Sequence, residues 1–257
     1  MKRVILVVIA LLGVSITPVQ ADGPQTVAII DTGYDASVSQ FANKIVYEQF
    51  YSSFAPTCPN GKSTMSGPGS AVLSPFLSAV PGAGHGSEML SGEILTNPNI
   101  KFVYIRAFTI ETKPALVVSP YDSDIPTILN WIAANASTYN IQAVSMSFAR
   151  PVTGACPTNT NIVSSVAKLQ ALNIPVFAGA GNDGNVKNVD FPACNAGVLA
   201  IGGEVNNSPA YWSNQGAGLA FDANGSLNVT SIGNSYVTSL GTSIATTIAA
   251  ASWVTIR

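Results

Sequence analysis

The chain has 257 residues, of which 47% are hydrophobic and only 9% are charged, and its formal net charge is −2. This length suits one large domain or two small ones with a real core, and the apolar share excludes an intrinsically disordered chain. The 11 Lys and Arg residues form no basic cluster. No nucleic-acid partner is therefore expected.

The first 21 residues have the pattern of an export signal peptide. Lys2 and Arg3 precede an apolar run over residues 4–16, and the small-residue motif Val19-Gln20-Ala21 follows. That run is shorter than the ~20 residues of a membrane-spanning helix. We expect cleavage after Ala21 and a secreted or periplasmic protein without a membrane partner. An uncleaved N-terminal anchor is the alternative.

Short apolar runs rich in Val and Ile predict buried strands. The first, T-V-A-I-I-D-T-G, spans residues 26–33 and ends in a turn. The others cover residues 102–108, 143–148, 174–181 and 198–203. Nearly continuous apolar strands separated by helical segments are typical of a parallel sheet that is covered on both faces.

Two amphipathic segments between these strands predict helices. One opens at Asp124 as its expected N-cap, and its apolar face comprises Ile128, Trp131 and Ile132. The other starts at Asn161, and its apolar face comprises Ile162, Val166, Leu169 and Leu172. We expect a single α/β domain over residues 22–257, with a mostly parallel central sheet and helices on both faces. No pro-domain is evident ahead of its first strand.

Residues 52–84 differ from the rest of the chain because they are rich in Ser, Pro and Gly and show little periodicity. They predict a surface loop insertion. Within them, G-K-S-T at residues 61–64 matches the end of a phosphate-binding loop. That loop needs a glycine where Pro56 stands, so we exclude a nucleotide site.

One histidine, His85, is available as a catalytic base in the whole chain. It lies in G-H-G-S between two glycines, ahead of an expected helix. Ser243, in L-G-T-S-I-A-T, precedes a run of small and apolar residues, and a serine hydroxyl needs a base to become a nucleophile. Asp31 ends an apolar strand, where a carboxylate needs a partner such as an imidazole. Each residue taken singly also has an ordinary structural explanation.

The order Asp, His, Ser along the chain separates the classes of serine hydrolase. A nucleophile-elbow enzyme needs G-x-S-x-G and a histidine after the serine, and the chain has neither. The chymotrypsin order needs a carboxylate between His85 and Ser243 in the setting of Asp31. Asp122, Asp124, Asp183 and Asp190 lie in that interval, but none of them has that setting.

Six blocks in order resemble the subtilisin-like serine peptidases (subtilases). V-A-I-I-D-T-G resembles the family's aspartate motif, and G-H-G-S resembles its histidine motif. V-F-A-G-A-G-N-D-G resembles the segment with the oxyanion asparagine, and G-T-S-I-A-T resembles the serine motif. Two lesser blocks are F-P-A followed by V-L-A-I-G-G, and Y-W-S-N-Q-G. The resemblance runs from Val27 to Ala251, which is nearly the whole mature chain.

The resemblance implies a role for individual residues. Asp31 would orient His85, and His85 would take the proton of Ser243. Asn182 and the Ser243 backbone N–H would form the oxyanion hole. The residues that would bind substrate are Ser147, Phe148, Ala149, Gly179, Ala180 and Gly181. The implied activity is that of a secreted serine endopeptidase that acts on a protein or peptide through an acyl-enzyme.

The resemblance also bears on how the cysteines pair and on which metal ions the protein would bind. Of Cys58, Cys156 and Cys194, the last two would form a disulfide, which leaves Cys58 over. A single histidine and the absence of C-x-x-C disfavour a zinc site. No cofactor is required. The resemblance leaves structural calcium open, although no D-x-[DN]-x-[DN]-G motif indicates it, so any such ion would be held by scattered oxygens.

The chain departs from the family where Thr247 replaces a usual proline, and where no pro-region is evident. Either the protein folds without such a region, or a separately encoded inhibitor or folding chaperone is a partner. Two alternatives stay open: a catalytically silent binding module on the same fold, and a peptide ligase or cyclase that uses the same triad. The acid-acting relatives, which carry glutamate in place of the histidine, are disfavoured by G-H-G-S.

Overall fold

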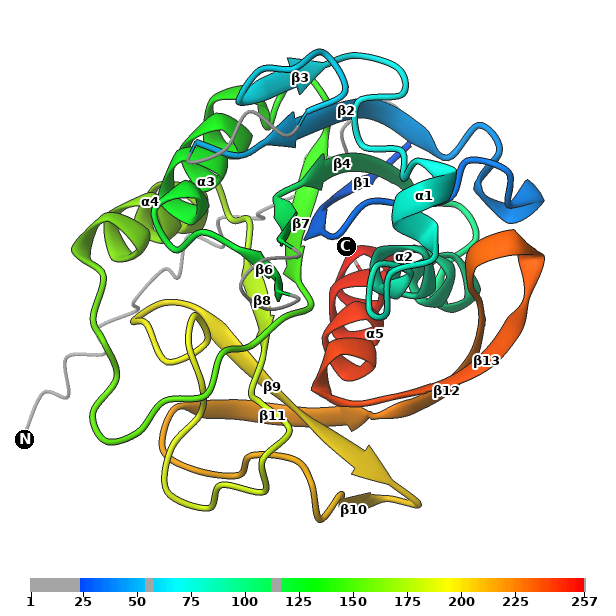
Figure 1. Ribbon diagram of the computed structural model, residues 1–257. Coiled ribbons are helices and arrows are strands. Elements are labelled where there is room, and N and C mark those ends of the chain that lie inside the picture. The colour runs from blue at the N-terminus through cyan, green and yellow to red at the C-terminus, as the bar shows by residue number, and fades with distance from the viewer. Residues whose placement is uncertain (1–23, 54–57, 112–116, 257) are drawn as a thin grey trace, which may run out of the picture.

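A mostly parallel sheet runs through the centre of the computed structural model, which describes residues 24–53, 58–111 and 117–256 (Figure 1). The segment predicted to be a signal peptide, residues 1–21, lies outside the described residues. Within them, the main sheet has the strand order β10-β9-β8-β7-β1-β4-β2-β3, and β11 pairs with β9 in addition. The pairs β10–β9 and β2–β3 are antiparallel, and the others are parallel.

The strands of this sheet are β1 (Thr26–Asp31), β2 (Ile45–Tyr51), β3 (Thr64–Ser66), β4 (Lys101–Arg106), β7 (Ile141–Met146), β8 (Val176–Gly179), β9 (Leu199–Val205), β10 (Ser208–Pro209) and β11 (Leu219–Asn224). Two hairpins lie outside it: β5 (Phe108–Glu111) with β6 (Val117–Pro120), and β12 (Ser226–Thr230) with β13 (Tyr236–Leu240). The helices are α1 (Pro75–Ser78), α2 (His85–Thr96), α3 (Asp124–Asn135), α4 (Thr160–Ala171) and α5 (Thr242–Thr255), with 3₁₀ turns at Ser39–Phe41 and Ile232–Asn234.

Alternate residues of each central strand pack against different helices, because successive side chains of a strand point to opposite faces. Ala28 and Ile30 of β1 join the apolar cluster of α3 and α4. Val27 and Ile29 join the cluster of α2 and α5. Figure 1 shows α3 and α4 on one side of the sheet and α2 and α5 on the other. The expected α/β domain with helices on both faces is confirmed.

The two amphipathic helices form, with corrections at their ends. Asp124 is not the N-cap of α3 but lies inside its first turn, and its carboxylate accepts the Ser53 N–H at 3.0 Å. The helix α4 begins at Thr160, one residue before the expected start at Asn161, and its N-cap is Asn159, whose side chain accepts the N–H groups of Asn161 and Ile162. Leu172 follows the end of α4 and is 49% exposed, because the helical face stops before it.

The predicted strands also shift by a few residues, and the run over residues 102–108 divides into β4 and β5 at Ala107. Residues 52–84 are only partly a surface loop, since they contain β3 and α1. Ala71 and Leu73 are buried, and their backbone groups bond to Tyr34 just after β1. Composition predicted a loop here because it reflects only local sequence, whereas the contacts that bury these residues join segments far apart in sequence.

A disulfide joins Cys156 and Cys194, the pair that the family resemblance implies. Cys58, the remaining cysteine, is buried and free. The bridge links the loop before α4 to the loop that follows β8. None of the helices in the described ranges has the length and hydrophobicity needed to cross a bilayer.

We expect replacement of both Cys156 and Cys194 by serine to lower the free energy of unfolding by roughly 3–4 kcal/mol, because the bridge closes a loop of 38 residues in the unfolded chain. Denaturant titration without reductant measures this change. Dithiothreitol should destabilise the original protein and leave the double variant unaffected. An unchanged midpoint in the double variant would contradict the prediction.

Candidate active site

Asp31 lies at the end of β1, where the carboxyl ends of β1, β4, β7 and β8 form one edge of the parallel sheet. Its side chain is 0% exposed. Oδ1 accepts the Thr32 N–H at 2.7 Å, and both carboxylate oxygens face His85 Nδ1, at 2.8 and 3.1 Å. A carboxylate only accepts, so Nδ1 carries the proton and Nε2 is left as the basic nitrogen.

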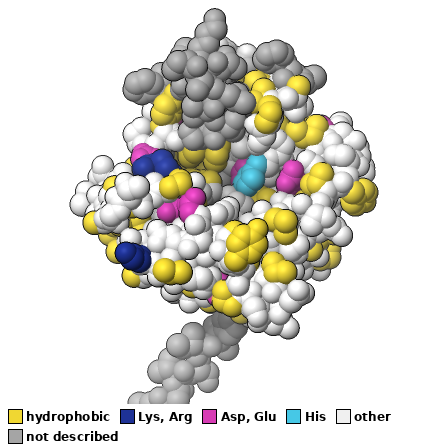
Figure 2. Space-filling model, turned by 60° about the horizontal axis from the view of Figure 1, so that its bottom comes forward, with side chains coloured by type: hydrophobic (Ala, Val, Ile, Leu, Met, Phe, Trp, Pro, Cys, Tyr) yellow, Lys and Arg dark blue, Asp and Glu magenta, His cyan; other side chains and the backbone are white. Residues whose placement is uncertain are grey.

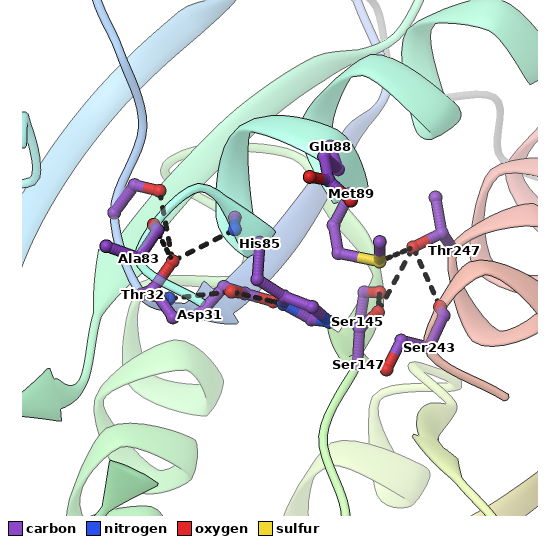
Figure 3. A network of polar contacts seen from close by, with 12 residues as sticks. Asp31, Thr32, Ala83, His85, Glu88, Met89, Ser145, Ser147, Ser243 and Thr247 are labelled. Atoms are coloured by element: carbon purple, nitrogen blue, oxygen red, sulfur yellow. Dashed lines mark hydrogen bonds and ion pairs between the residues drawn. The ribbon is translucent and has the colours of Figure 1, made fainter. Parts of the chain in front are cut away.

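His85 is the first residue of α2, and a close approach of two backbones holds it beside Asp31. The Gly86 N–H donates to Thr32 Oγ1 at 2.9 Å, and Thr32 Oγ1 donates to the Ala83 carbonyl at 2.8 Å (Figure 3). A Cβ atom at Gly86 would lie 2.0 Å from Tyr104 Oη. Only glycine therefore allows α2 to begin this close to β1 and β4, which explains the second glycine of G-H-G-S.

The pKa of His85 is set by opposing effects. Burial lowers it, but the charge of Asp31, the hydrogen bond to Asp31 and the charge of Glu88 together raise the pKa above its ordinary value. The imidazole side chain is still 29% exposed. This arrangement stabilises the imidazolium that forms when the ring accepts a proton.

Ser243 lies in the first turn of α5, where backbone N–H groups have no carbonyl acceptor earlier in the helix. Asn182 is positioned beside it, since Asn182 Oδ1 accepts the Thr242 N–H at 2.8 Å. This bond leaves the Asn182 Nδ2 group to donate elsewhere. Two donors, Asn182 Nδ2 and the Ser243 N–H, thus lie at the same end of α5.

One pocket of about 380 Å³ brings these groups together. Its lining comprises Thr32, Gly82, His85, Phe108, Ser147, Phe148, Ala149, Pro151, Asn182, Asp183, Asp190 and Ser243. Figure 2 shows the single histidine in a hollow of this face, with acidic side chains to either side. In the part of the chain that the structure describes, no hydrogen bond joins the Ser243 hydroxyl to His85. Such bonds are often long in unliganded enzymes.

The residues expected to bind substrate divide into two groups. Ser147, Phe148 and Ala149 line the pocket. Gly179, Ala180 and Gly181 are not among its lining residues, and backbone groups of Ala180 bond to Ile201, Asp190 and Asn214. The Gly181 N–H donates to Thr242 Oγ1 at 3.2 Å, so this segment also positions the start of α5.

A buried polar network that the sequence did not reveal lies behind Ser243. Thr247 Oγ1 donates to the Ser243 carbonyl at 3.1 Å and lies 3.1 Å from Ser147 Oγ, which in turn lies 3.3 Å from Ser145 Oγ (Figure 3). Thr247 therefore has a structural place where the family usually has proline.

Glu93 of α2 is fully buried, and neither of its carboxyl oxygens has a partner of ordinary hydrogen-bond geometry among the described residues. Burial raises the pKa of Glu93 well above its ordinary value, the nearby Ser145 hydroxyl opposes the shift, and the charge of Asp31 adds to it. The buried carboxyl of Glu93 therefore favours its protonated form more than an exposed glutamate does. In the described residues, no three His, Cys, Asp or Glu side chains are placed to hold a metal ion.

A parallel α/β sheet whose edge carries an aspartate, a histidine and a serine in this chain order defines a subtilisin-like protein. The chain belongs to the subtilase family, which it matches over residues 23–257. No curated protein sequence shows a significant match.

Solved structures with the same fold include a cold-adapted subtilisin-like serine proteinase, with a TM-score of 0.63, 21% identity and coverage of 88% of this chain and 72% of that one. A protease from Pseudoalteromonas arctica gives a TM-score of 0.68 at 20% identity, with 88% and 75% covered. The prenylagaramide maturation protease PagA gives a TM-score of 0.61 at 19% identity, with coverage of 88% of this chain and 72% of that one. At these identities the likeness shows the fold alone.

We expect Glu93→Gln to become more stabilising as the pH rises. The unfolded carboxyl ionises above a pKa of about 4.3 while the folded one stays protonated, so the original protein loses about 1.4 kcal/mol of stability per pH unit until the raised pKa is reached. The neutral glutamine lacks this loss. Denaturant titrations between pH 5 and 8 measure the difference, with Glu204→Gln at a partly exposed site as control. A difference that does not vary with pH would refute the assignment.

Proposed function

We propose that the protein is a serine endopeptidase that cleaves peptide bonds through an acyl-enzyme on Ser243. The observation that carries the proposal is the hydrogen bond between Asp31 and His85, whose ring lines the same pocket as Ser243 and Asn182. Family membership supports the reaction class. The proposed site is the set expected from the sequence: Asp31, His85, Asn182 and Ser243.

In the proposed mechanism, Ser243 Oγ attacks the carbonyl carbon of the scissile bond while His85 Nε2 takes the hydroxyl proton. Asp31 holds the ring in the Nδ1–H form and stabilises the imidazolium. Asn182 Nδ2 and the Ser243 N–H donate to the carbonyl oxygen as it becomes negative. The leaving amine takes the proton from His85 as the C–N bond breaks.

A water molecule completes the reaction. It attacks the Ser243 ester while His85 takes its proton, and collapse of the second tetrahedral intermediate returns a proton to Ser243 Oγ and releases the carboxylic acid. An amine in place of water would give a ligase or cyclase, so product analysis separates these two outcomes. The disulfide between Cys156 and Cys194 supports an oxidising compartment, and we propose that the protein works outside the cytoplasm.

A fluorophosphonate probe should label the protein, because the probe traps a serine that a neighbouring base has activated. We expect labelling to disappear in Ser243→Ala and in His85→Ala. Ser208→Ala, at an exposed serine of β10, is the matched control and should be labelled like the original protein. A folded original protein that is not labelled would reject the proposal and favour a silent binding module.

The rate of probe labelling should fall in acid with a midpoint above pH 6.5, the ordinary pKa of histidine, because His85 must be neutral to accept a proton and its pKa is raised. Glu88→Gln removes one of the charges that raise this pKa, so it should move the midpoint to lower pH. The measurement is the labelling rate between pH 5 and 9. A midpoint at or below 6.5, or one that Glu88→Gln leaves in place, would contradict this account of the site.

A further inference from the structure

The pocket beside Ser243 contains two carboxyl groups that the proposed mechanism does not use, those of Asp183 and Asp190. We propose that these two aspartates select substrates with lysine or arginine at P1, the residue whose carbonyl Ser243 attacks. The inference rests on the proposed peptidase function and names its substrate class.

The chain itself places the two carboxyls near the P1 side chain. Asp183 directly follows Asn182, the residue that would bind the P1 carbonyl oxygen, and its N–H donates to Asn214 Oδ1 at 3.1 Å. Asp190 is held by its backbone, since its N–H donates to the Ala180 carbonyl at 2.8 Å. A substrate whose carbonyl reaches Asn182 therefore has its P1 side chain close to both aspartates.

Asp190 is a buried acid with an incomplete set of partners. It is 2% exposed, and its Oδ1 accepts the Val152 N–H at 3.1 Å. Its Oδ2 is buried and has no hydrogen-bond partner among the described residues. A buried carboxylate is costly unless a cation or hydrogen-bond donors compensate it. The Asp183 and Asn214 side chains interact with this carboxyl, so a donor that enters the pocket meets two carboxyl groups together.

The described residues supply no cation to this pair. The ion pairs found among them are His85 with Asp31, and Arg150 with Asp122. The Arg150 guanidinium also lies 4.8 Å from the centre of the Phe191 ring, so its charge is engaged at the neighbouring Asp122. Burial, and next the adjacent Asp183 carboxyl, raise the pKa of Asp190 to about 6. A bound ammonium or guanidinium would reverse this shift by stabilising the ionised form.

The remaining lining suits the stem of a long basic side chain. Phe108, Phe148 and Pro151 give the pocket apolar walls, and the two phenylalanine rings meet edge to face at 5.3 Å. Lysine and arginine bury their methylene stems on apolar surface while the charged end finds a polar partner. A buried aspartate in a P1 pocket selects basic residues in trypsin by the same physics.

The test is a set of fluorogenic peptides that differ only at P1, with Arg, Lys, Leu, Phe or Glu in that place. We expect the full protein to cleave the Arg and Lys peptides with a kcat/KM about 10²-fold above that of the Leu peptide, since an unpaired buried charge costs several kcal/mol. Asp190→Asn keeps the Oδ1 acceptor for Val152 and should reduce this ratio at least about tenfold. Asp183→Asn, at an exposed site, should reduce it less. Asp222→Asn, a carboxylate outside the pocket, is the matched control.

The outcomes separate this inference from the proposed function. Cleavage with equal preference for Leu or Phe, or an unchanged ratio in Asp190→Asn, would overturn the inference while leaving the peptidase proposal intact. Binding of benzamidine, a small aromatic cation, tests the pocket without turnover. Binding by the original protein that Asp190→Asn weakens supports the inference, and no binding at millimolar benzamidine counts against it. Failure of fluorophosphonate labelling together with benzamidine binding would reject the peptidase proposal alone.

Discussion

The structure depends on the burial of one carboxylate, that of Asp31, at the end of the central strand. A charge at 0% exposure must be compensated, and the compensation comes from the Thr32 N–H and the His85 ring. Meeting that need fixes the start of α2 against β1, which in turn requires glycine at position 86. Removing one partner of such a buried pair typically costs about 3–5 kcal/mol. The same contact that stabilises the fold therefore also orients the candidate base.

Parallel strand order brings the other groups to the same place. The carboxyl ends of β1, β7 and β8 share one edge. Asp31 ends β1 there, and the segments that follow β7 and β8 carry Ser147 and Asn182 to the pocket that His85 lines. The helices α2 and α5 pack on the same face of the sheet and present His85 and Ser243 from their first turns (Figure 1). The two other acids that line the pocket, Asp183 and Asp190, lie in the connection between β8 and β9.

Much of the fold could be predicted because its central elements have strong periodic patterns. The runs that became β1, β7 and β8 are nearly all apolar, and α3 and α4 show a clear apolar face. The strands β11 and β13 were missed because their side chains are mostly part-exposed or exposed, and they show no continuous apolar run. The expected N-cap of α3, Asp124, lies instead inside its first turn, because capping depends on the local geometry of the helix start and not on residue type alone.

The sequence by itself determined which chemistry the site can perform, because a chain with one histidine has one candidate imidazole base, and the order Asp31, His85, Ser243 excludes two other classes of hydrolase. It also determined the family, since six blocks occur in order. Only the tertiary structure decided that Glu93 is fully buried beside Ser145, and that Asp183 and Asp190 share the pocket of Ser243. The reason is physical: the state of a carboxyl depends on the dielectric and the partners around it, and residues distant in sequence supply both.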